Sequence, residues 1–268
     1  MSPEHAPLRS GPRVAVLVSV GRHPVTGRPR RADQDARAVE LALGLEQADT
    51  RLLHAGRHDD DSDSALRGYL GMGFDSLELI EQNADADVVP ALVEALRTQS
   101  PRLVLTGAHA ETGEGSGMLP WLLAEALGWP VVGGLAAIEK IERDTATLLQ
   151  ALPRGRRRRL RVRLPFVATV DQSAAPARQS AFGPARRGGF EAVAKESRAD
   201  ELQAVWQVAP ARKRPARLKV VKSGSARDRF KAAAAKSGGG GGKVLEDATP
   251  DQGAEAIMAL LREEGVLR

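Results

Sequence analysis

Apolar residues occur in short blocks through the first half of the chain, and polar residues separate the blocks. Four blocks have consecutive apolar positions, as in strands buried on both faces, at residues 14–20, 52–55, 76–80 and 103–106. Apolar residues at helical spacing predict a helix that begins near Asp33 or Asp35, with either residue as its cap, and further helices at 64–72, 87–98 and 119–127. This alternation predicts an α/β fold with a parallel sheet and right-handed crossovers.

The carboxyl ends of parallel strands collect ligands in such folds. Four loops converge on that edge of the predicted sheet, at residues 19–31, 55–61, 81–85 and 107–117. The last loop contains several glycines and precedes a helix, whose free N–H groups and partial positive charge favour a phosphate. It lacks the Lys-Ser/Thr pair of a P-loop and has only part of the dinucleotide fingerprint. The residues therefore leave two interpretations open, a phosphate-binding loop and an ordinary glycine-rich connection.

Beyond Pro130 the pattern changes to extended segments, at 131–141, 146–152, 159–164 and 165–170. Between residues 157 and 163, arginines alternate with Leu160 and Val162, so that one face of this strand is strongly cationic. We favour an exposed edge strand that charge protects from aggregation over a strand that recognises phosphate.

The side chains suggest neither a catalytic set nor a metal site. His109 has no serine or carboxylate placed to make it a triad base, and the other histidines lack metal-ligand spacing. We expect four histidines at the surface or lining loops, namely His23, His54, His58 and His109. The aspartates at 59–63 lack the glycine and distant glutamate of a calcium loop and predict a charged helix start. The absence of cysteine excludes disulfides and thiolate chemistry.

Charge is unevenly distributed along the chain. Residues 1–152 hold 14 Lys/Arg and 22 Asp/Glu, whereas residues 153–243 hold 23 and 6. The basic block suits an acidic partner, nucleic acid or a solvated extension. Aromatic residues are only 3% of the chain, which argues against a nucleic-acid binder that stacks bases. No apolar run reaches the roughly 18 residues of a membrane span, and residues 1–12 lack the apolar segment of a secretory signal, so we expect a cytoplasmic protein.

Composition divides the chain into three parts. These are an α/β domain at 1–206 with additional strands at 131–171, a basic Pro/Gly-rich linker at 207–243, and a C-terminal helix at 244–268. The linker has too little apolar surface to fold alone and contains one predicted short helix at 226–236. The last helix begins near Thr249-Pro250, with Thr249 as cap. Its apolar stripe needs another surface, so we expect it to dock on a partner; the stripe is Ala254, Ile257, Leu260 and Leu261.

Several motifs occur in the order and spacing of a known family. They are the stretch 103–130, Leu-Pro-Phe-Val-Ala-Thr-Val-Asp at 164–171, Pro-Val-Thr-Gly-Arg at 24–28 and Ala-Val-Glu at 38–40. Over most of 13–176, and again at 243–268, the chain resembles the β subunit of electron-transfer flavoproteins. The resemblance implies a Rossmann-like (adenine-nucleotide α-hydrolase-like) parallel sheet with helices on both faces and an extended C-terminal arm. It also implies a heterodimer with an α subunit that holds most of the FAD.

By the same resemblance, the chain is an electron carrier without a catalytic set of its own. The resemblance implies that electrons pass from flavoprotein dehydrogenases to an electron-transfer flavoprotein-quinone oxidoreductase. It also implies that the β subunit binds a structural AMP. Its pocket, carried over to this chain, consists of Ser19, Ala32, Asp33, Gln34, Asp35, Ala55, Thr112, Gly113, Glu114, Gly115, Ser116, Gly117, Met118 and Leu119.

The loop at 112–118 departs from the family pattern Asp-Gly-Asp-Thr-Gly-Gln, with one more glycine and no glutamine. Backbone N–H groups from Gly115 to Met118 still suit a phosphate, and the Ser116 hydroxyl adds a donor. Glu114 beside an anion is unfavourable unless its side chain turns outward.

The chain departs further after Asp171, where relatives carry an Asn-Glu-Pro-Arg run and a leucine-bearing loop that docks the dehydrogenase. Here Phe182 is the one large apolar residue, near Arg186 and Arg187. Either Phe182 replaces the leucine as an exposed anchor or it folds back onto its own domain. The changed loop favours an amine-oxidising donor, such as a dimethylglycine-type dehydrogenase. Two other functions stay open, a stand-alone adenine-nucleotide-binding regulator and a basic nucleic-acid binder.

Overall fold

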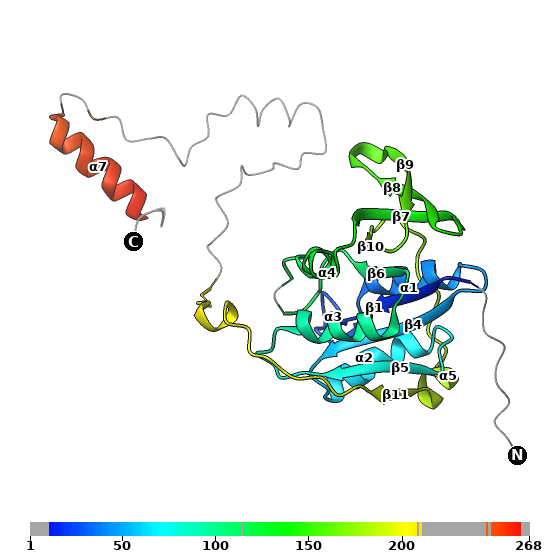
Figure 1. The fold of residues 1–268 in the computed structure, drawn as a ribbon. Helices are drawn as coiled ribbons and strands as arrows, with labels where there is room; N and C mark the ends of the chain where they lie inside the picture. Colours follow the sequence, from blue (N-terminus) through cyan, green and yellow to red (C-terminus); the bar gives the residue numbers. More distant parts are fainter. Residues whose placement is uncertain (1–10, 114, 208, 211–244, 246–247, 264–268) are drawn as a thin grey trace, which may run out of the picture. The chain divides into compact units, whose positions relative to one another are not determined.

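The structure is a computed structural model of the 268-residue chain (Figure 1). It describes residues 11–113, 115–207, 209–210, 245 and 248–263. The chain forms two compact units, Met1–Gln207 and Val208–Arg268, and each is described by itself. The short helix predicted at 226–236 and most of the predicted linker lie outside the described residues.

A nine-stranded sheet forms the centre of the first unit, in the order β11-β5-β4-β1-β6-β10-β7-β8-β9. The strands are β1 (Arg13–Leu17), β4 (Asp49–Gly56), β5 (Ser76–Glu81), β6 (Leu103–Gly107), β7 (Val131–Glu142), β8 (Thr145–Ala151), β9 (Arg157–Arg163), β10 (Phe166–Val170) and β11 (Gly189–Ala192). Neighbours pair in parallel from β11 to β7, and β7–β8 and β8–β9 pair antiparallel. The predicted parallel α/β sheet is confirmed, with an antiparallel extension at one end.

Helices cover both faces of the parallel part. They are α1 (Asp33–Leu43), α2 (Asp60–Leu70), α3 (Val88–Gln99) and α4 (Leu119–Leu127), followed by the short α5 (Phe182–Arg187) and the 3-10 turns at Pro153–Gly155 and Gln203–Val205. Val14 and Val16 of β1 pack in a core cluster with residues of α1 and α2, whereas Ala15 and Leu17 pack in a second cluster with residues of α3 and α4. The consecutive apolar residues of β1 thus serve two cores, as expected for a strand covered on both faces.

The predicted first strand and the loop at 19–31 are partly wrong. The strand ends at Leu17, and Val20 begins a separate two-stranded sheet of β2 (Val20–Arg22) and β3 (Pro29–Arg31). The turn of this hairpin is closed by His23, whose N–H donates to the Arg28 carbonyl at 2.9 Å. A hairpin this short, with proline and glycine in its turn, has no alternating pattern to reveal it.

Helix α1 begins at Asp33, as predicted, but its cap and the start of α2 differ from the prediction. The residue before α1 is Ala32, which makes no side-chain cap bond, so neither Asp33 nor Asp35 caps the helix. Helix α2 begins at Asp60, earlier than predicted, because Asp59 and Ser62 form a capping box. The Ser62 N–H donates to Asp59 Oδ1 at 3.0 Å, and the Asp59 N–H donates to Ser62 Oγ at 2.7 Å. The aspartate run does charge the helix start.

The arginine-rich strand β9 lies at the edge of the sheet, as predicted. Leu160 and Val162 pack on the core, and all five of its arginines are exposed. At the opposite edge, β11 pairs with β5, and no apolar pattern predicted that strand.

In the second unit, the described helix is α7 (Pro250–Glu263). The Gln252 N–H donates to Thr249 Oγ1 at 3.4 Å, which confirms Thr249 as its cap. Ile257 is 61% exposed and Leu260 is 53% exposed, so the predicted stripe presents apolar surface. That this stripe docks on a partner stays a prediction.

Candidate functional site

Those predicted pocket residues that the structure describes lie at the carboxyl edge of the parallel strands. Ser19 follows β1, Ala55 is near the end of β4, and Gly107 ends β6. These strands are neighbours or next neighbours in the sheet. Residues 32–35 start α1 beside them. The structure therefore places residues that are far apart in the sequence around one polar network.

Asp35 is the centre of this network and is 5% exposed. Its Oδ2 accepts hydrogen bonds from the Ser19 N–H at 2.8 Å and the Ser19 hydroxyl at 2.5 Å, and its Oδ1 accepts from the Gly107 N–H at 2.8 Å. Burial raises the pKa of Asp35 to about 6, although the bonds from Ser19 and Gly107 oppose this shift. Asp35 joins the ends of β1 and β6 to α1.

The other residues at the start of α1 each bond to a different element. The Ala32 N–H donates to the Tyr69 hydroxyl, which donates to the Ser19 carbonyl, both at 2.8 Å. Gln34 Oε1 accepts from the Ala108 N–H at 2.9 Å. Burial raises the pKa of Tyr69 well above its ordinary value, so the hydroxyl stays protonated and can donate. Sequence reasoning missed Tyr69; its only signal is that it is the single tyrosine of the chain.

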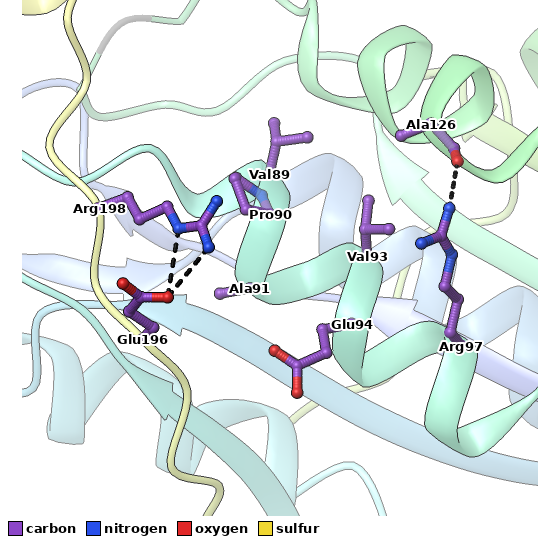
Figure 2. Close-up of a pocket in the computed structure, with 9 residues that line it drawn as sticks. All are labelled: Val89, Pro90, Ala91, Val93, Glu94, Arg97, Ala126, Glu196 and Arg198. Carbon is purple, nitrogen blue, oxygen red and sulfur yellow. Dashed lines mark hydrogen bonds and ion pairs between the residues drawn. The ribbon is translucent and has the colours of Figure 1, made fainter.

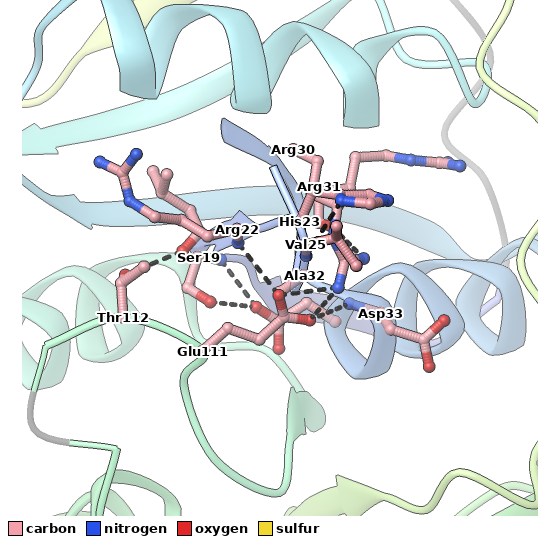
Figure 3. Close-up of polar contacts among 12 residues, drawn as sticks. Ser19, Arg22, His23, Val25, Arg30, Arg31, Ala32, Asp33, Glu111 and Thr112 are labelled. Carbon is pink, nitrogen blue, oxygen red and sulfur yellow. Dashed lines mark hydrogen bonds and ion pairs between the residues drawn. The ribbon is translucent and has the colours of Figure 1, made fainter. Parts of the chain in front are cut away.

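Glu111 is a second residue that the sequence did not reveal. Its carboxylate accepts from the Asp33 N–H at 2.8 Å, the Arg22 N–H at 3.1 Å, and Arg30 Nη2 at 3.0 and 3.1 Å (Figure 3). A carboxylate from the glycine-rich loop thus sits at the positive end of α1. The sequence gives no local signal for these bonds, because their donors lie 78 to 89 residues before Glu111 in the chain. Glu114, for which a conflict with an anion was predicted, lies outside the described residues.

The bend itself has the backbone that glycine permits. Gly113, Gly115 and Gly117 have positive φ angles of 76°, 65° and 76°. A Cβ on Gly117 would lie 2.7 Å from the Ala108 carbonyl oxygen, so only glycine fits there.

The donors of this bend suit an anion. The Met118 N–H donates to Ser116 Oγ at 3.2 Å. Within the part of the chain that the structure describes, the N–H groups of Ser116 and Gly117 have no acceptor, and Ser116 is exposed. Pro120, in the first turn of α4, supplies no N–H. The bend therefore offers free donors, and such donors suit a phosphate.

The histidine prediction was wrong for His54. It is 6% exposed at the end of β4, and its Nδ1 lies 2.8 Å from the Val18 carbonyl oxygen. Burial lowers its pKa, so it is held neutral as a structural group. His23 and His109 are exposed, as predicted. Among the described residues, no group of His, Cys, Asp and Glu could hold a metal ion.

A surface groove of about 410 Å³ lies away from this edge. It runs along α3 and is lined by Val89, Pro90, Ala91, Val93, Glu94, Arg97, Ala126, Glu196 and Arg198 (Figure 2). A groove of about 240 Å³ lies at the amino ends of β1 and β4, beside Arg13, Asp49 and Gln99. In the described residues, no helix is long and apolar enough to cross a membrane.

Phe182 is 78% exposed at the start of α5, so it does not fold back onto its own domain. Arg186 and Arg187 are exposed in the last turn of the same helix. Phe182 is therefore an exposed apolar side chain on the same short helix as two cationic side chains. Of the two alternatives that the sequence left open, this is the exposed anchor.

The mostly parallel sheet with helices on both faces defines a Rossmann-like α/β protein. A family model described as the electron transfer flavoprotein domain matches residues 22–201. A protein from Chromohalobacter salexigens named electron transfer flavoprotein subunit beta is 65% identical over 268 residues, which is 100% of both chains. The chain belongs to the electron transfer flavoprotein family and is of its β-subunit type, which confirms the resemblance seen in the sequence.

More distant relatives agree over shorter stretches. An electron transfer flavoprotein subunit beta from Syntrophomonas wolfei is 33% identical over 110 residues, 39% of this chain and 43% of the relative. A putative electron transfer flavoprotein subunit, YgcR of Escherichia coli, is 31% identical over 173 residues, 61% of each chain.

Proposed function

We propose that this chain is the β subunit of a heterodimeric electron carrier, with FAD held mainly by an α subunit. The full-length identity to a protein named electron transfer flavoprotein subunit beta carries the proposal. The FAD supplies the redox chemistry, and the protein supplies binding and orientation. The exposed stripe on α7, with Ile257 and Leu260, is the surface proposed to meet the α subunit.

Co-expression with an electron transfer flavoprotein α subunit tests this proposal. The expected product is a stable heterodimer with flavin absorption, whereas the chain expressed alone lacks flavin. A chain that folds alone as a monomer, binds an adenine nucleotide and ignores the α subunit would instead support the regulatory function. A salt-dependent gel shift with duplex or single-stranded DNA would support the nucleic-acid function.

The heterodimer is also proposed to hold a structural AMP at the carboxyl edge. The free N–H groups of Ser116 and Gly117 are the phosphate donors, and Ser19, Gln34 and Ala55 lie along the same edge. Glu111 already neutralises the start of α1, so the phosphate is expected at the bend.

Heat release of nucleotide from the purified heterodimer, followed by chromatography, tests the AMP proposal. Gly117→Ala should lose most of the AMP, because the new Cβ forces the bend away from the Ala108 carbonyl. Gly189→Ala is the matched control, since its Cβ would meet nothing within 4 Å. Release of no AMP from the unsubstituted heterodimer would contradict the proposal.

Phe182, Arg186 and Arg187 are proposed as the docking surface for the electron donor. An exposed aromatic beside arginines has the composition of interface anchors. The heterodimer should accept electrons from an amine-oxidising enzyme and pass them to a quinone oxidoreductase. Steady-state reduction by acyl-CoA, dimethylglycine and sarcosine dehydrogenases tests the donor class, and Phe182→Ala should raise the KM for the heterodimer with the productive enzyme.

A further inference from the structure

The docking surface follows a segment that contacts α1 and the end of α2. This segment, residues 172–181, is called the strap; it leaves β10 and reaches α5 and β11 beside α2 (Figure 1). It contains no helix or strand. Arg37 Nη1 donates to the Ala174 carbonyl at 2.6 Å, and Arg178 of the strap bonds to both carboxylate oxygens of Glu40 at 2.9 and 3.0 Å. Side chains of α1 thus fix the first part of the strap.

The last part of the strap is fixed against the end of α2. The Ala181 N–H donates to the Gly71 carbonyl at 2.9 Å. A Cβ on Gly71 would overlap Ser180 Oγ and lie 2.9 Å from the Ala181 carbonyl oxygen. Gly71 has an ordinary right-handed backbone with φ −62°, so close approach of the strap, not conformation, requires glycine here.

Arg67 of α2 holds the far end of α5. Its Nη1 lies 3.3 Å from the Ala185 carbonyl oxygen, 3.5 Å from that of Arg186 and 3.2 Å from that of Gly188. The guanidinium is itself oriented, because Nε donates to Asp63 at 2.8 Å and the group lies over the Phe190 ring at 5.1 Å. The last carbonyls of a helix lack partners within the helix, and Arg67 supplies one.

A helix of the length of α5, 6 residues, does not persist by itself in water. Phe182 makes little contact of its own, since it is 78% exposed. The conformation that presents Phe182 therefore depends on contacts at both ends of α5, with Gly71 before it and Arg67 after it.

We propose that Arg67 is a positioning residue for the docking surface of Phe182, Arg186 and Arg187. It keeps α5 folded before a partner arrives, so that docking does not have to order this segment. The inference rests on the proposed function, in which this surface meets the electron-donating dehydrogenase.

The test uses Arg67→Met in the co-expressed heterodimer. Backbone hydrogen exchange should become faster at residues 181–189 and stay unchanged in β1 and β6. The KM for the heterodimer as substrate of the dehydrogenase should rise by about fivefold to tenfold with unchanged kcat, because only docking requires an ordered α5. Arg97→Met is the matched control, since it loses a guanidinium bond to the Ala126 carbonyl at 2.8 Å on another helix. It should change neither measurement.

Two further variants separate positioning from general stability. Gly71→Ala displaces the strap while Arg67 remains, and it should raise KM in the same way. In a Phe182→Ala background, Arg67→Met should change KM by less than about twofold, because the anchor that it positions is gone. If a dehydrogenase reduces the unsubstituted heterodimer normally, and Arg67→Met has the hydrogen exchange or the KM of the wild type, the positioning role of Arg67 is wrong. The proposed docking function then still stands. If none of the three dehydrogenases reduces the unsubstituted heterodimer, the proposed docking function fails, and this role fails with it.

Discussion

The centre of the nine-stranded sheet and its antiparallel end differ in their exposure to water. Every residue of β6 and of β10 is buried, and helices cover both faces of these parallel strands. In β9, at the antiparallel end, exposed arginines alternate with half-buried Leu160 and Val162. One sheet thus contains strands that pack on a core with both faces and a strand that packs on a core with one face. The comparison shows that strand patterns report the number of covered faces, not merely the presence of a strand.

Truncation of core side chains should show the largest difference between the centre and the antiparallel end of the sheet. Phe166 in β10 is fully buried, and Phe166→Ala should cost about 3–5 kcal/mol of unfolding free energy. Leu160 in β9 is half-buried, and Leu160→Ala should cost about 1–2 kcal/mol. Denaturant unfolding measures both values. Equal losses would contradict the one-core description of β9.

The second-largest effect is expected in the pH dependence of the unfolding free energy. The pKa of Asp35 is raised from 3.8 to about 6, so its carboxyl binds a proton more tightly in the folded state than in the unfolded state. Its contribution is therefore full below about pH 4 and is lost as pH rises through about 6, a change of about 3 kcal/mol.

Unfolding of the wild type and of Asp35→Asn between pH 4 and pH 7 measures this change. Asp35→Asn should lack that slope. Asp171, after β10, is the control, because hydrogen bonding to Ser173 lowers its pKa and gives the opposite sign at lower pH. A slope that Asp35→Asn leaves intact would show that another group titrates.

A smaller effect is expected from single hydroxyl groups. Tyr69→Phe removes the partner of the buried Ala32 N–H and should cost about 1–3 kcal/mol. Thr147→Val in β8 is the control, because the Thr147 hydroxyl has no hydrogen-bond partner among the described residues. Thermal unfolding should place Tyr69→Phe clearly below wild type and Thr147→Val close to it.

The smallest effect on stability is expected from the arginines of β9. Replacement of Arg157, Arg161 and Arg163 by serine should leave Tm nearly unchanged, because these exposed side chains pack little. Light scattering at fixed concentration should show faster aggregation, because the free edge of β9 loses its charge. Unchanged aggregation would contradict the protective role of the arginines.

The sequence reveals the buried, two-core part of the fold well. Apolar runs such as 103–106 and the helical spacing in α3 are local signals, and the structure agrees with them. The position of a strand within the sheet, in contrast, depends on distant residues. Residues 189–192 form β11 because β5 offers a free edge and Arg67 anchors the preceding turn, and neither cause is visible in those residues.

The candidate site divides in the same way. Small residues and glycines indicated the bend, and the family resemblance indicated the start of α1. The bonds of Glu111 to Arg30 and to the Asp33 N–H join segments far apart in the chain, so no local pattern predicts them. Asp35 was predicted as a possible cap and as a pocket residue, and only burial reveals it as the group that joins β1, β6 and α1.

The place of β10 in the sheet has a consequence for synthesis on the ribosome. This strand, residues 166–170, lies between β6 and β7, which both precede it in the chain. During translation, the edges of β6 and β7 that pair with β10 therefore stay unpaired until β10 has left the exit tunnel and inserted between them. Slow codons or a stalled ribosome that delay the exit of residues 166–170 from the tunnel would prolong the life of this open intermediate, and chaperones that shield unpaired strands should bind such nascent chains.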